Sequence, residues 1–240
     1  NSKIPLVTCI TDVSIHNEWI SPYTNLYMVA TEKVKANLVK NGVNPKDIII
    51  KGIPVRAQFK DIYKERPREN KGEKTLLIMG GGLGLIPLGK DFYDQVSKFN
   101  NLRINVLVGN NKKEYARLSN KYANIKVIGY TNRVHDYMAE ADLIITKAGG
   151  VTTFESIYSN LPLIILAPFL EQERSNAKFI EENSIGEIAW DKSADLVRMV
   201  LRLINDDRKL ISMQNNMDKI ISGINKTTFP DLVKRLDQVV

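Results

Sequence analysis

The chain has 240 residues, of which 43% are hydrophobic and 25% are charged, and its formal net charge is +7 at pH 7. This length and composition are ordinary for a globular protein with a buried core, and they exclude a disordered, collagen-like or disulfide-rich chain. The longest apolar stretch, residues 161–170, is too short to cross a membrane as a helix and contains two prolines. We therefore expect neither a membrane span nor a secretory signal peptide.

The cysteine and histidine content narrows the chemistry further. Cys9 is the single cysteine of the sequence, so it cannot form an internal disulfide. We expect an intracellular protein in which this thiol is buried as a small hydrophobe. One cysteine and two histidines argue against a classical zinc site. The basic charge suits an anionic small molecule, an anionic membrane or a nucleic acid, and composition alone does not separate them.

The first quarter of the chain predicts strands joined by a helix. Apolar residues over 4–10, 26–30 and 48–50 indicate buried strands. Between the last two, Thr31 can cap a helix that continues to residue 39, where Asn41 and Gly42 stop it. A strand–helix–strand unit with such short connections is typical of a parallel sheet.

Residues 59–73 are charged and contain Pro67 and Gly72, and we interpret them as a linker between a domain over 1–58 and a domain over 74–240. After the linker the strand and helix patterns alternate again, which predicts a doubly wound parallel α/β sheet. The expected strands cover residues 75–79, 104–108, 125–128, 143–146 and 163–166. The expected helices cover residues 90–100, 112–122, 134–141, 152–159, 177–183, 194–205, 208–221 and 229–239.

Two glycine-containing segments follow predicted strands and could bind an anion. Residues 80–84 read Gly-Gly-Gly-Leu-Gly, and glycines allow backbone N–H groups to approach a phosphate closely. The run is neither a dinucleotide fingerprint nor a P-loop, so a plain tight turn is the alternative. In the second segment, Gly149 and Gly150 turn the chain into a helix that carries Thr152 and Glu155.

Glu155 has two interpretations. We place it in the first turn of that helix, where a carboxylate favours the helix dipole. Alternatively, it grips a pair of vicinal hydroxyls, as a carboxylate does on a ribose. Farther along, residues 171–176 form a polar cluster after an apolar strand. The cluster suits a polyhydroxylated ligand, or it is simply a solvated helix start.

Taken in order, several blocks resemble one family over essentially the whole chain. They are Thr11-Asp12 with His16 and Trp19, then residues 29–32, 52–55, 79–84, 108–111, 146–155 and Gln172-Glu173. The sequence resembles the processive diacylglycerol glucosyltransferases and monogalactosyldiacylglycerol synthases, which are glycosyltransferase family 28-like. Two positions depart from the family pattern, since Leu83 replaces a polar residue and Leu170-Glu171 replaces a Pro-Gly pair.

The resemblance implies a GT-B fold, in which two Rossmann-like domains face each other across a cleft. Residues 1–58 would be the carboxyl-terminal part of the acceptor domain, only partly present here, and 74–240 a complete domain for the UDP-sugar donor. The diphosphate would contact Gly81, Gly82, Gly84, Gly150, Val151 and Thr152. The uracil would meet the backbone at Arg133 and Val134, and the ribose would meet Glu155. The sugar hydroxyls would meet Gln172 and Glu173, supported by Asn176, with Asn111 in the same donor site.

The implied reaction transfers a hexose from UDP-glucose or UDP-galactose to a diacylglycerol-type lipid with inversion. No metal or other cofactor is expected, and the sequence contains no Asp-x-Asp motif. The catalytic base of the family precedes the first residue of this chain, and His16 matches a family histidine near the cleft without being assigned as the base. We therefore expect the chain alone to bind donor but to turn over poorly.

The same resemblance implies a cytoplasmic protein, peripheral to the cell membrane and in contact with its anionic surface. Nucleic-acid binding would rest on charge alone, so we do not expect it. Three alternatives stay open: a related transferase with another acceptor, a non-catalytic nucleotide-sugar-binding subunit completed by a partner chain, and a UDP-sugar epimerase, against which the Thr11-Asp12…His16 block argues.

Overall fold

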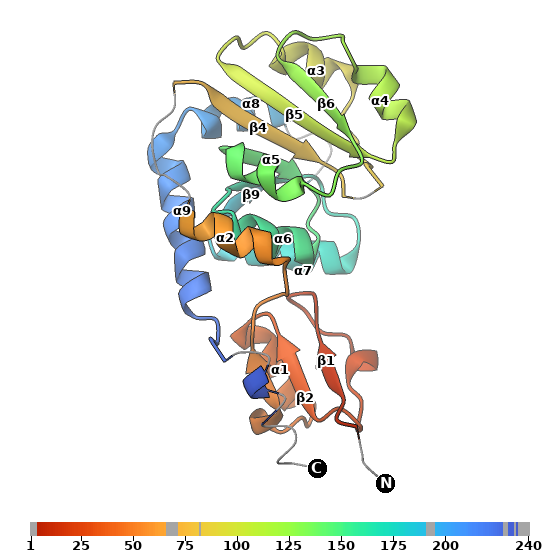
Figure 1. Cartoon of the computed structure of the whole chain (residues 1–240), viewed down its shortest axis with the longest axis vertical. Helices are drawn as coiled ribbons and strands as arrows, with labels where there is room; N and C mark the ends of the chain where they lie inside the picture. The colour runs from red at the N-terminus through yellow and green to blue at the C-terminus, as the bar shows by residue number, and fades with distance from the viewer. Residues whose placement is uncertain are drawn as a thin grey trace.

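The computed structural model describes residues 4–65, 72–81, 83–190, 195–227, 230–232 and 234, and these form two parallel sheets joined by helices (Figure 1). The small sheet has the strand order β1-β2-β3. Its strands are β1 (Val7–Cys9), β2 (Leu26–Val29) and β3 (Ile48–Ile50). The parallel pairing of all three strands confirms the prediction for this part of the chain.

The large sheet has six strands in the order β6-β5-β4-β7-β8-β9, and every neighbouring pair is parallel. Its strands are β4 (Lys74–Met79), β5 (Leu102–Gly109), β6 (Ile125–Gly129), β7 (Leu143–Thr146), β8 (Leu163–Ile165) and β9 (Gly186–Ile188). The chain winds outward from β4 to β6, returns to β7 beside β4, and winds the other way to β9. This is the predicted doubly wound sheet, and it places a topological switch point between β4 and β7.

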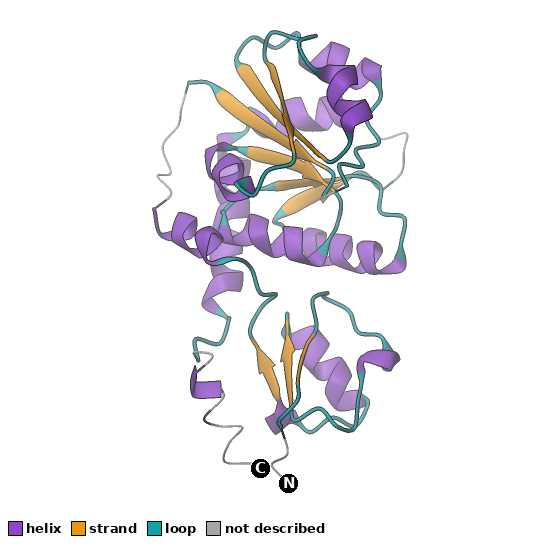
Figure 2. Ribbon diagram, turned by 45° about the vertical axis from the view of Figure 1, so that its right-hand side comes forward, coloured by secondary structure: helices purple, strands orange, loops and turns teal. Residues whose placement is uncertain are grey.

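Helices cover both faces of the large sheet (Figure 2). They are α3 (Lys90–Val96), α4 (Lys112–Leu118), α5 (Val134–Glu140), α6 (Gly150–Tyr158), α7 (Glu171–Glu182), α8 (Leu196–Ile204) and α9 (Asp207–Ser222). A hydrophobic core lies on each face of the large sheet, and the side chains of β4 point alternately into one and the other. Leu77 packs with α5, α6 and α7, whereas Leu76 packs with α3, α4 and α8. A strand buried on both faces must be apolar throughout, which is why β4 reads as a continuous hydrophobic run.

The small sheet is covered by α1 (Glu32–Lys40), with the short turns η1 (Asn17–Trp19) and η2 (Pro45–Asp47) beside it. Thr31 caps α1 as predicted, since its side chain accepts a hydrogen bond from the Val34 N–H. The predicted strand over 4–10 is shortened to β1, and Ile4 is 90% exposed. Cys9 is exposed, so the prediction of a buried thiol is wrong. Within the described residues β1 pairs only with β2, so its other edge is paired with no described strand.

The predicted linker begins as a helix instead. Helix α2 (Ala57–Glu65) packs against α5 and α6 (Figure 1), and the Phe59 side chain is fully buried in the core that these helices share. The many charged residues of this segment led to the prediction of a linker, whereas the apolar side chain of Phe59 anchors a helix there. Residues 66–71, the rest of the predicted linker, lie outside the described part of the chain, and the domain bounds 1–58, 59–73 and 74–240 stay a prediction.

The chain returns to the small sheet after α9. The Asn225 N–H donates to the Ile50 carbonyl at 2.9 Å, and the Lys51 ammonium donates to the Asn225 carbonyl at 2.7 Å. Leu232 packs with Leu26 and Ile49. Of the helix predicted over 229–239, only residues 230–232 and 234 are described, and these are helical.

Replacing Phe59 by Ala tests whether α2 belongs to the folded core. The substitution should lower the free energy of unfolding by about 3–5 kcal/mol, because it leaves a cavity beneath α5 and α6. Urea unfolding followed by circular dichroism would measure it. Gln58→Ala on the exposed side of α2 is the control, and a loss for Phe59→Ala no larger than for this control would mean that α2 does not stabilise the fold.

Candidate functional site

A cavity of about 190 Å³ lies at the carboxyl ends of β4, β5 and β6, beside the switch point. It is lined by Arg56, Met79, Gly81, Leu107, Gly109, Gly129, Tyr130, Thr131, Val134, Thr152 and Glu155. Ligands of open α/β sheets bind at this edge, because the loops after β4 and β7 leave in opposite directions and open a crevice. Four of the residues predicted from the sequence therefore lie together: Gly81, Val134, Thr152 and Glu155.

The glycine loop, residues 80–89 between β4 and α3, needs its glycines for geometric reasons. Gly81 and Gly84 have φ values of +73° and +60°, a region that side chains disfavour. A Cβ atom on Gly84 would lie 1.8 Å from the Val108 carbonyl oxygen, so the loop packs directly on the end of β5. Gly81 lines the cavity, whereas Gly84 closes the turn by donating its N–H to the Gly81 carbonyl at 2.9 Å. Gly82, predicted in the same group, lies outside the described residues.

Helix α6 begins at Gly150, two residues before its predicted start, and Thr152 in its first turn lines the cavity. Backbone N–H groups of a first helical turn have no partner within the helix and can bind an anion. Gly150 itself packs tightly, since a Cβ there would lie 2.1 Å from the Thr11 carbonyl oxygen. Val151 is 43% exposed and points away from the core.

Glu155 is the sixth residue of α6, so the interpretation as a first-turn carboxylate is wrong. Its side chain is only 12% exposed and lines the cavity. Burial raises the pKa of Glu155, and the nearby charge of Arg56 opposes that rise. A carboxylate held at the wall of a cavity, with one cation at its side, can accept hydrogen bonds from a ligand.

Sequence reasoning missed Arg56, the cationic residue among those that line the cavity. Its guanidinium lies 3.8 Å from the Glu155 carboxylate, donates to the Asn132 carbonyl at 3.1 Å, and lies 5.3 Å from the centre of the Phe59 ring. Arg56 directly follows the block 52–55 that carried the resemblance. A single arginine in a basic chain has no distinguishing sequence pattern. Ile53 and Phe59, on either side of Arg56 in the sequence, are both buried in the core, and this packing holds Arg56 at the cavity.

The β6–α5 loop forms the opposite wall through Tyr130, Thr131 and Val134. Arg133 turns away: its side chain is 75% exposed and pairs with Asp136, while its N–H donates to the Thr131 hydroxyl at 3.0 Å. Arg133 does not line the cavity, and its predicted backbone contact with the uracil stays a prediction. Tyr130, which is 72% exposed, was not predicted.

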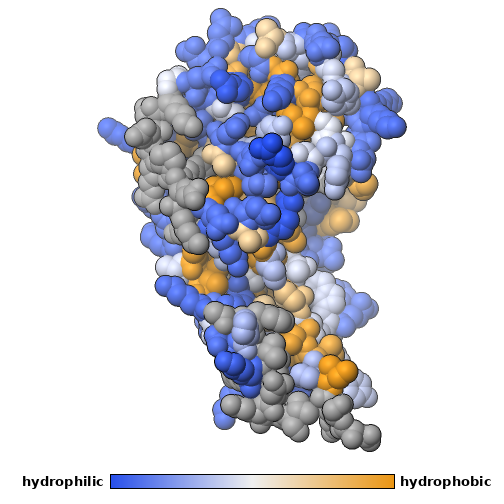
Figure 3. Space-filling model, viewed as in Figure 1, coloured by the Kyte–Doolittle hydropathy of each residue, from blue (hydrophilic) through white to orange (hydrophobic). Residues whose placement is uncertain are grey.

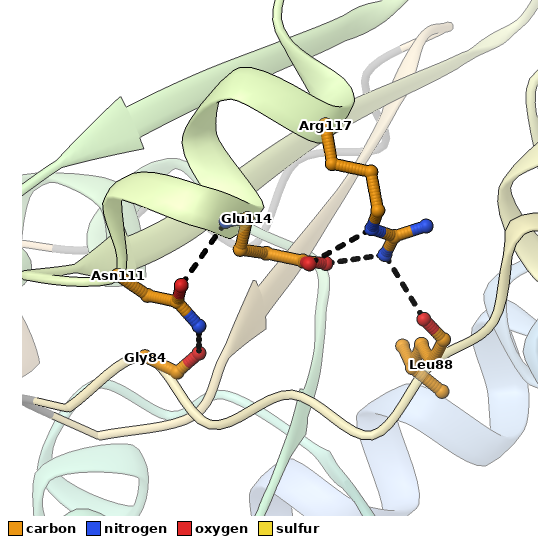
Figure 4. Close-up of polar contacts among 5 residues, drawn as sticks. All are labelled: Gly84, Leu88, Asn111, Glu114 and Arg117. Carbon is orange, nitrogen blue, oxygen red and sulfur yellow. Dashed lines mark hydrogen bonds and ion pairs between the residues drawn. The ribbon is translucent and has the colours of Figure 1, made fainter.

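Asn111 does not line the cavity but lies behind the glycine loop (Figure 4). It caps α4, where its side-chain oxygen accepts from the Glu114 N–H at 3.0 Å, and its amide nitrogen donates to the Gly84 carbonyl at 3.2 Å. Both ends of the side-chain amide have protein partners. In this structure Asn111 supports the loop rather than facing the cavity.

The polar cluster over 171–176 is the start of α7, six residues before the predicted helix. Glu173 accepts hydrogen bonds from the N–H groups of Phe169 at 3.0 Å and Leu170 at 3.4 Å, which caps the helix. Gln172 is exposed beside it. Neither side chain lines the cavity, so the structure does not bring them together with Glu155.

Asn176 joins the two sheets. It is 1% exposed, its amide nitrogen donates to the Asp12 carboxylate and to the Ala148 carbonyl, each at 2.9 Å, and its oxygen accepts from the Val13 N–H at 3.2 Å. These bonds fasten the segment after β1 to the loop after β7. His16 lies outside this contact: its side chain is 62% exposed, 3.7 Å from Glu18.

The described residues contain no group of three or more His, Cys, Asp or Glu side chains that could hold a metal ion. None of the described helices has the length and hydropathy needed to cross a bilayer. On the face drawn in Figure 3, hydrophilic residues cover most of the surface, and apolar residues lie in separate patches.

Known relatives match most of this chain. A processive diacylglycerol beta-glucosyltransferase from Staphylococcus aureus (strain Newman) is 30% identical over 229 residues, which is 91% of this chain and 58% of the relative. The same values hold for the protein of that name from strain COL. The chain thus spans somewhat more than half the length of these curated relatives.

Solved structures share the fold at lower identity. MurG from Acinetobacter baumannii superposes with a TM-score of 0.68 at 16% identity, covering 98% of this chain and 68% of that one. The glycosyltransferase of kitacinnamycin has a TM-score of 0.64 at 15% identity, covering 89% and 55%. A UDP-N-acetylglucosamine 2-epimerase has a TM-score of 0.58 at 15% identity, covering 83% and 56%. These likenesses confirm the GT-B type of fold.

Two family models match consecutive parts of the sequence. Residues 1–55 match monogalactosyldiacylglycerol (MGDG) synthase, and residues 75–236 match the glycosyltransferase family 28 C-terminal domain. The second match covers the large sheet from Thr75 on, the glycine loop, α6 and every residue that lines the cavity except Arg56. The chain therefore belongs to glycosyltransferase family 28.

Proposed function

We propose that this chain binds a UDP-hexose, UDP-glucose or UDP-galactose, as the donor for an inverting transfer to a diacylglycerol-type lipid. The observation that carries the proposal is the cavity at the switch point. There the buried carboxylate of Glu155 faces the same space as the glycine loop and the first turn of α6. Membership of family 28 and the names of the Staphylococcus aureus relatives support the transferase reaction and the lipid acceptor.

The diphosphate, the ribose and the uracil of the proposed donor can each be matched to residues that line the cavity. The diphosphate suits the space between Gly81 and the first turn of α6, where backbone N–H groups and the helix dipole favour negative charge. The ribose suits Glu155, since a carboxylate accepts from both vicinal hydroxyls. The uracil suits the wall formed by the backbone before Val134. The sugar contacts of Gln172 and Glu173, supported by Asn176, stay a prediction, because their side chains do not line the cavity.

In the proposed transfer, an acceptor hydroxyl oxygen bonds to the anomeric carbon while the bond from that carbon to UDP breaks. The hydroxyl proton passes to a general base, and the departing UDP gains negative charge. Arg56 and the α6 N-terminus can stabilise that charge from the protein side. We assign no base among the described residues, and transfer without a metal or other cofactor stays a proposal.

The acceptor and the location are proposed from the charge of the chain. The basic net charge of +7 suits the anionic surface on which a diacylglycerol acceptor lies. A cytoplasmic protein at the membrane periphery is proposed on that basis. Acceptor profiling with diacylglycerol, monoglycosyl diacylglycerol and a peptidoglycan precursor would separate the lipid transferase from a relative with another acceptor. Purification together with a second polypeptide would favour the non-catalytic subunit.

Titration calorimetry of the chain with UDP tests the donor site. We expect UDP to bind and Glu155→Ala to weaken the binding about 10- to 100-fold, because hydrogen bonds to a charged group contribute about 1.5–3 kcal/mol. Glu181→Ala, an exposed glutamate on α7, is the control and should bind UDP like the wild type. Parallel titrations with UDP-glucose, UDP-galactose and UDP-N-acetylglucosamine would rank the donors. Absence of UDP binding, or equal binding by Glu155→Ala, would refute the assignment.

The burial of Glu155 predicts a pH dependence of stability. Its pKa is raised from the ordinary 4.5, so the folded chain binds the proton more tightly than the unfolded chain. The free energy of unfolding should therefore fall as the pH rises from about 4.5 through the raised pKa. Glu155→Gln removes this titration, so its stability relative to the wild type should increase between about pH 4 and pH 7. Urea unfolding at the two pH values measures the difference, and a pH-independent difference would contradict the raised pKa.

A further inference from the structure

Helix α4 holds the glycine loop at two separate points (Figure 4). In the middle of the loop, the Asn111 amide nitrogen donates to the Gly84 carbonyl at 3.2 Å. Near its end, the Arg117 guanidinium donates to the Leu88 carbonyl at 3.1 Å. Both donors are side chains of α4 or its cap, and both acceptors are backbone carbonyls of the loop.

Glu114 connects these two contacts. Its N–H donates to the Asn111 side chain at 3.0 Å, and its carboxylate pairs with Arg117 through two hydrogen bonds, one of them 2.8 Å from Nε to Oε2. The Glu114 side chain is 12% exposed, so its charge requires the paired guanidinium. A planar guanidinium held in this way has a fixed direction, and its Nη2, which also pairs with Glu114, donates to the Leu88 carbonyl.

Apolar packing of side chains does not anchor the loop at Leu83 and Leu85. Ile86 and Leu88 are buried, but Leu83 and Leu85 are 70% and 50% exposed, and two glycines adopt positive φ. Fixing such residues costs about 1–2 kcal/mol of backbone entropy each. Hydrogen bonds from α4 order part of the loop in the free protein, so less backbone entropy is lost when a ligand binds, and binding is favoured.

We propose that Asn111, Glu114 and Arg117 are positioning residues that order the glycine loop for the diphosphate of the donor. This inference rests on the proposed function, because it assigns the diphosphate to the loop. None of the three lines the cavity. They act through the Gly84 and Leu88 carbonyls, which fix the loop backbone after Gly81, the described loop residue that lines the cavity. Gly84 transmits this order directly, because its N–H donates to the Gly81 carbonyl at 2.9 Å.

The test compares UDP with uridine, which lacks the phosphates. Arg117→Gln should raise the Kd of UDP about tenfold, the effect of losing an ordered hydrogen-bond contact, and should leave the Kd of uridine within about twofold. Calorimetry would measure UDP, and ligand-observed NMR would measure the weaker uridine. Arg202→Gln is the matched control, since it breaks another bidentate Arg–Glu pair, with Glu187, away from the loop. It should leave both affinities unchanged.

Two further variants keep the test independent of folding defects. Asn111→Ser retains a helix-capping oxygen but loses the donor to Gly84, so it should weaken UDP and spare uridine in the same way. Arg117→Lys retains a cation and should recover part of the UDP affinity. Equal losses for UDP and uridine, or unchanged UDP binding in Arg117→Gln and Asn111→Ser, would overturn the positioning role alone. A wild-type chain that binds no UDP would overturn the proposed function with it.

Discussion

The parallel pairing of β4 with both β5 and β7 is the constraint on which the site depends. Because β4 lies between two parallel neighbours and is buried on both faces, its carboxyl end meets the ends of β5 and β7 at one edge of the sheet. The connections then leave toward opposite faces, since β5 follows β4 on one side and β8 follows β7 on the other. The cavity at this edge is a consequence of strand order, and the glycine loop and α6 only shape it.

The second determinant is the junction between the two sheets. The small sheet meets the large one where Gly150 has no side chain to separate α6 from Thr11, and where Asn176 hydrogen-bonds across the contact. Helix α2 then anchors the connection through Phe59, which leaves Arg56 beside Glu155. A buried carboxylate needs a charged partner or a ligand to offset the loss of hydration. Here the partner comes from a segment before the large sheet, so the site depends on both parts of the chain.

The sequence was sufficient for much of this arrangement. Apolar runs predicted every described strand except β9, whose sequence Gly-Glu-Ile contains no apolar run. Glycines after strands located the loop and the region where α6 begins. The predicted start of α7 was six residues late because the first residues of this helix are polar, and Glu173 caps the helix at that point. Helix α2 was missed because a single buried Phe59 anchors an otherwise charged segment. Arg56, and the use of Asn111 behind the loop, follow from tertiary contacts that no local pattern encodes.

The most direct test of the account is a crystal structure of this chain with UDP bound. It should place the ribose hydroxyls on the Glu155 carboxylate, the diphosphate between Gly81 and the first turn of α6, and the uracil against the backbone before Val134. UDP bound at another edge of the sheet, or bound in the cavity with its phosphates directed away from the glycine loop, would contradict the central claim that strand order builds the donor site.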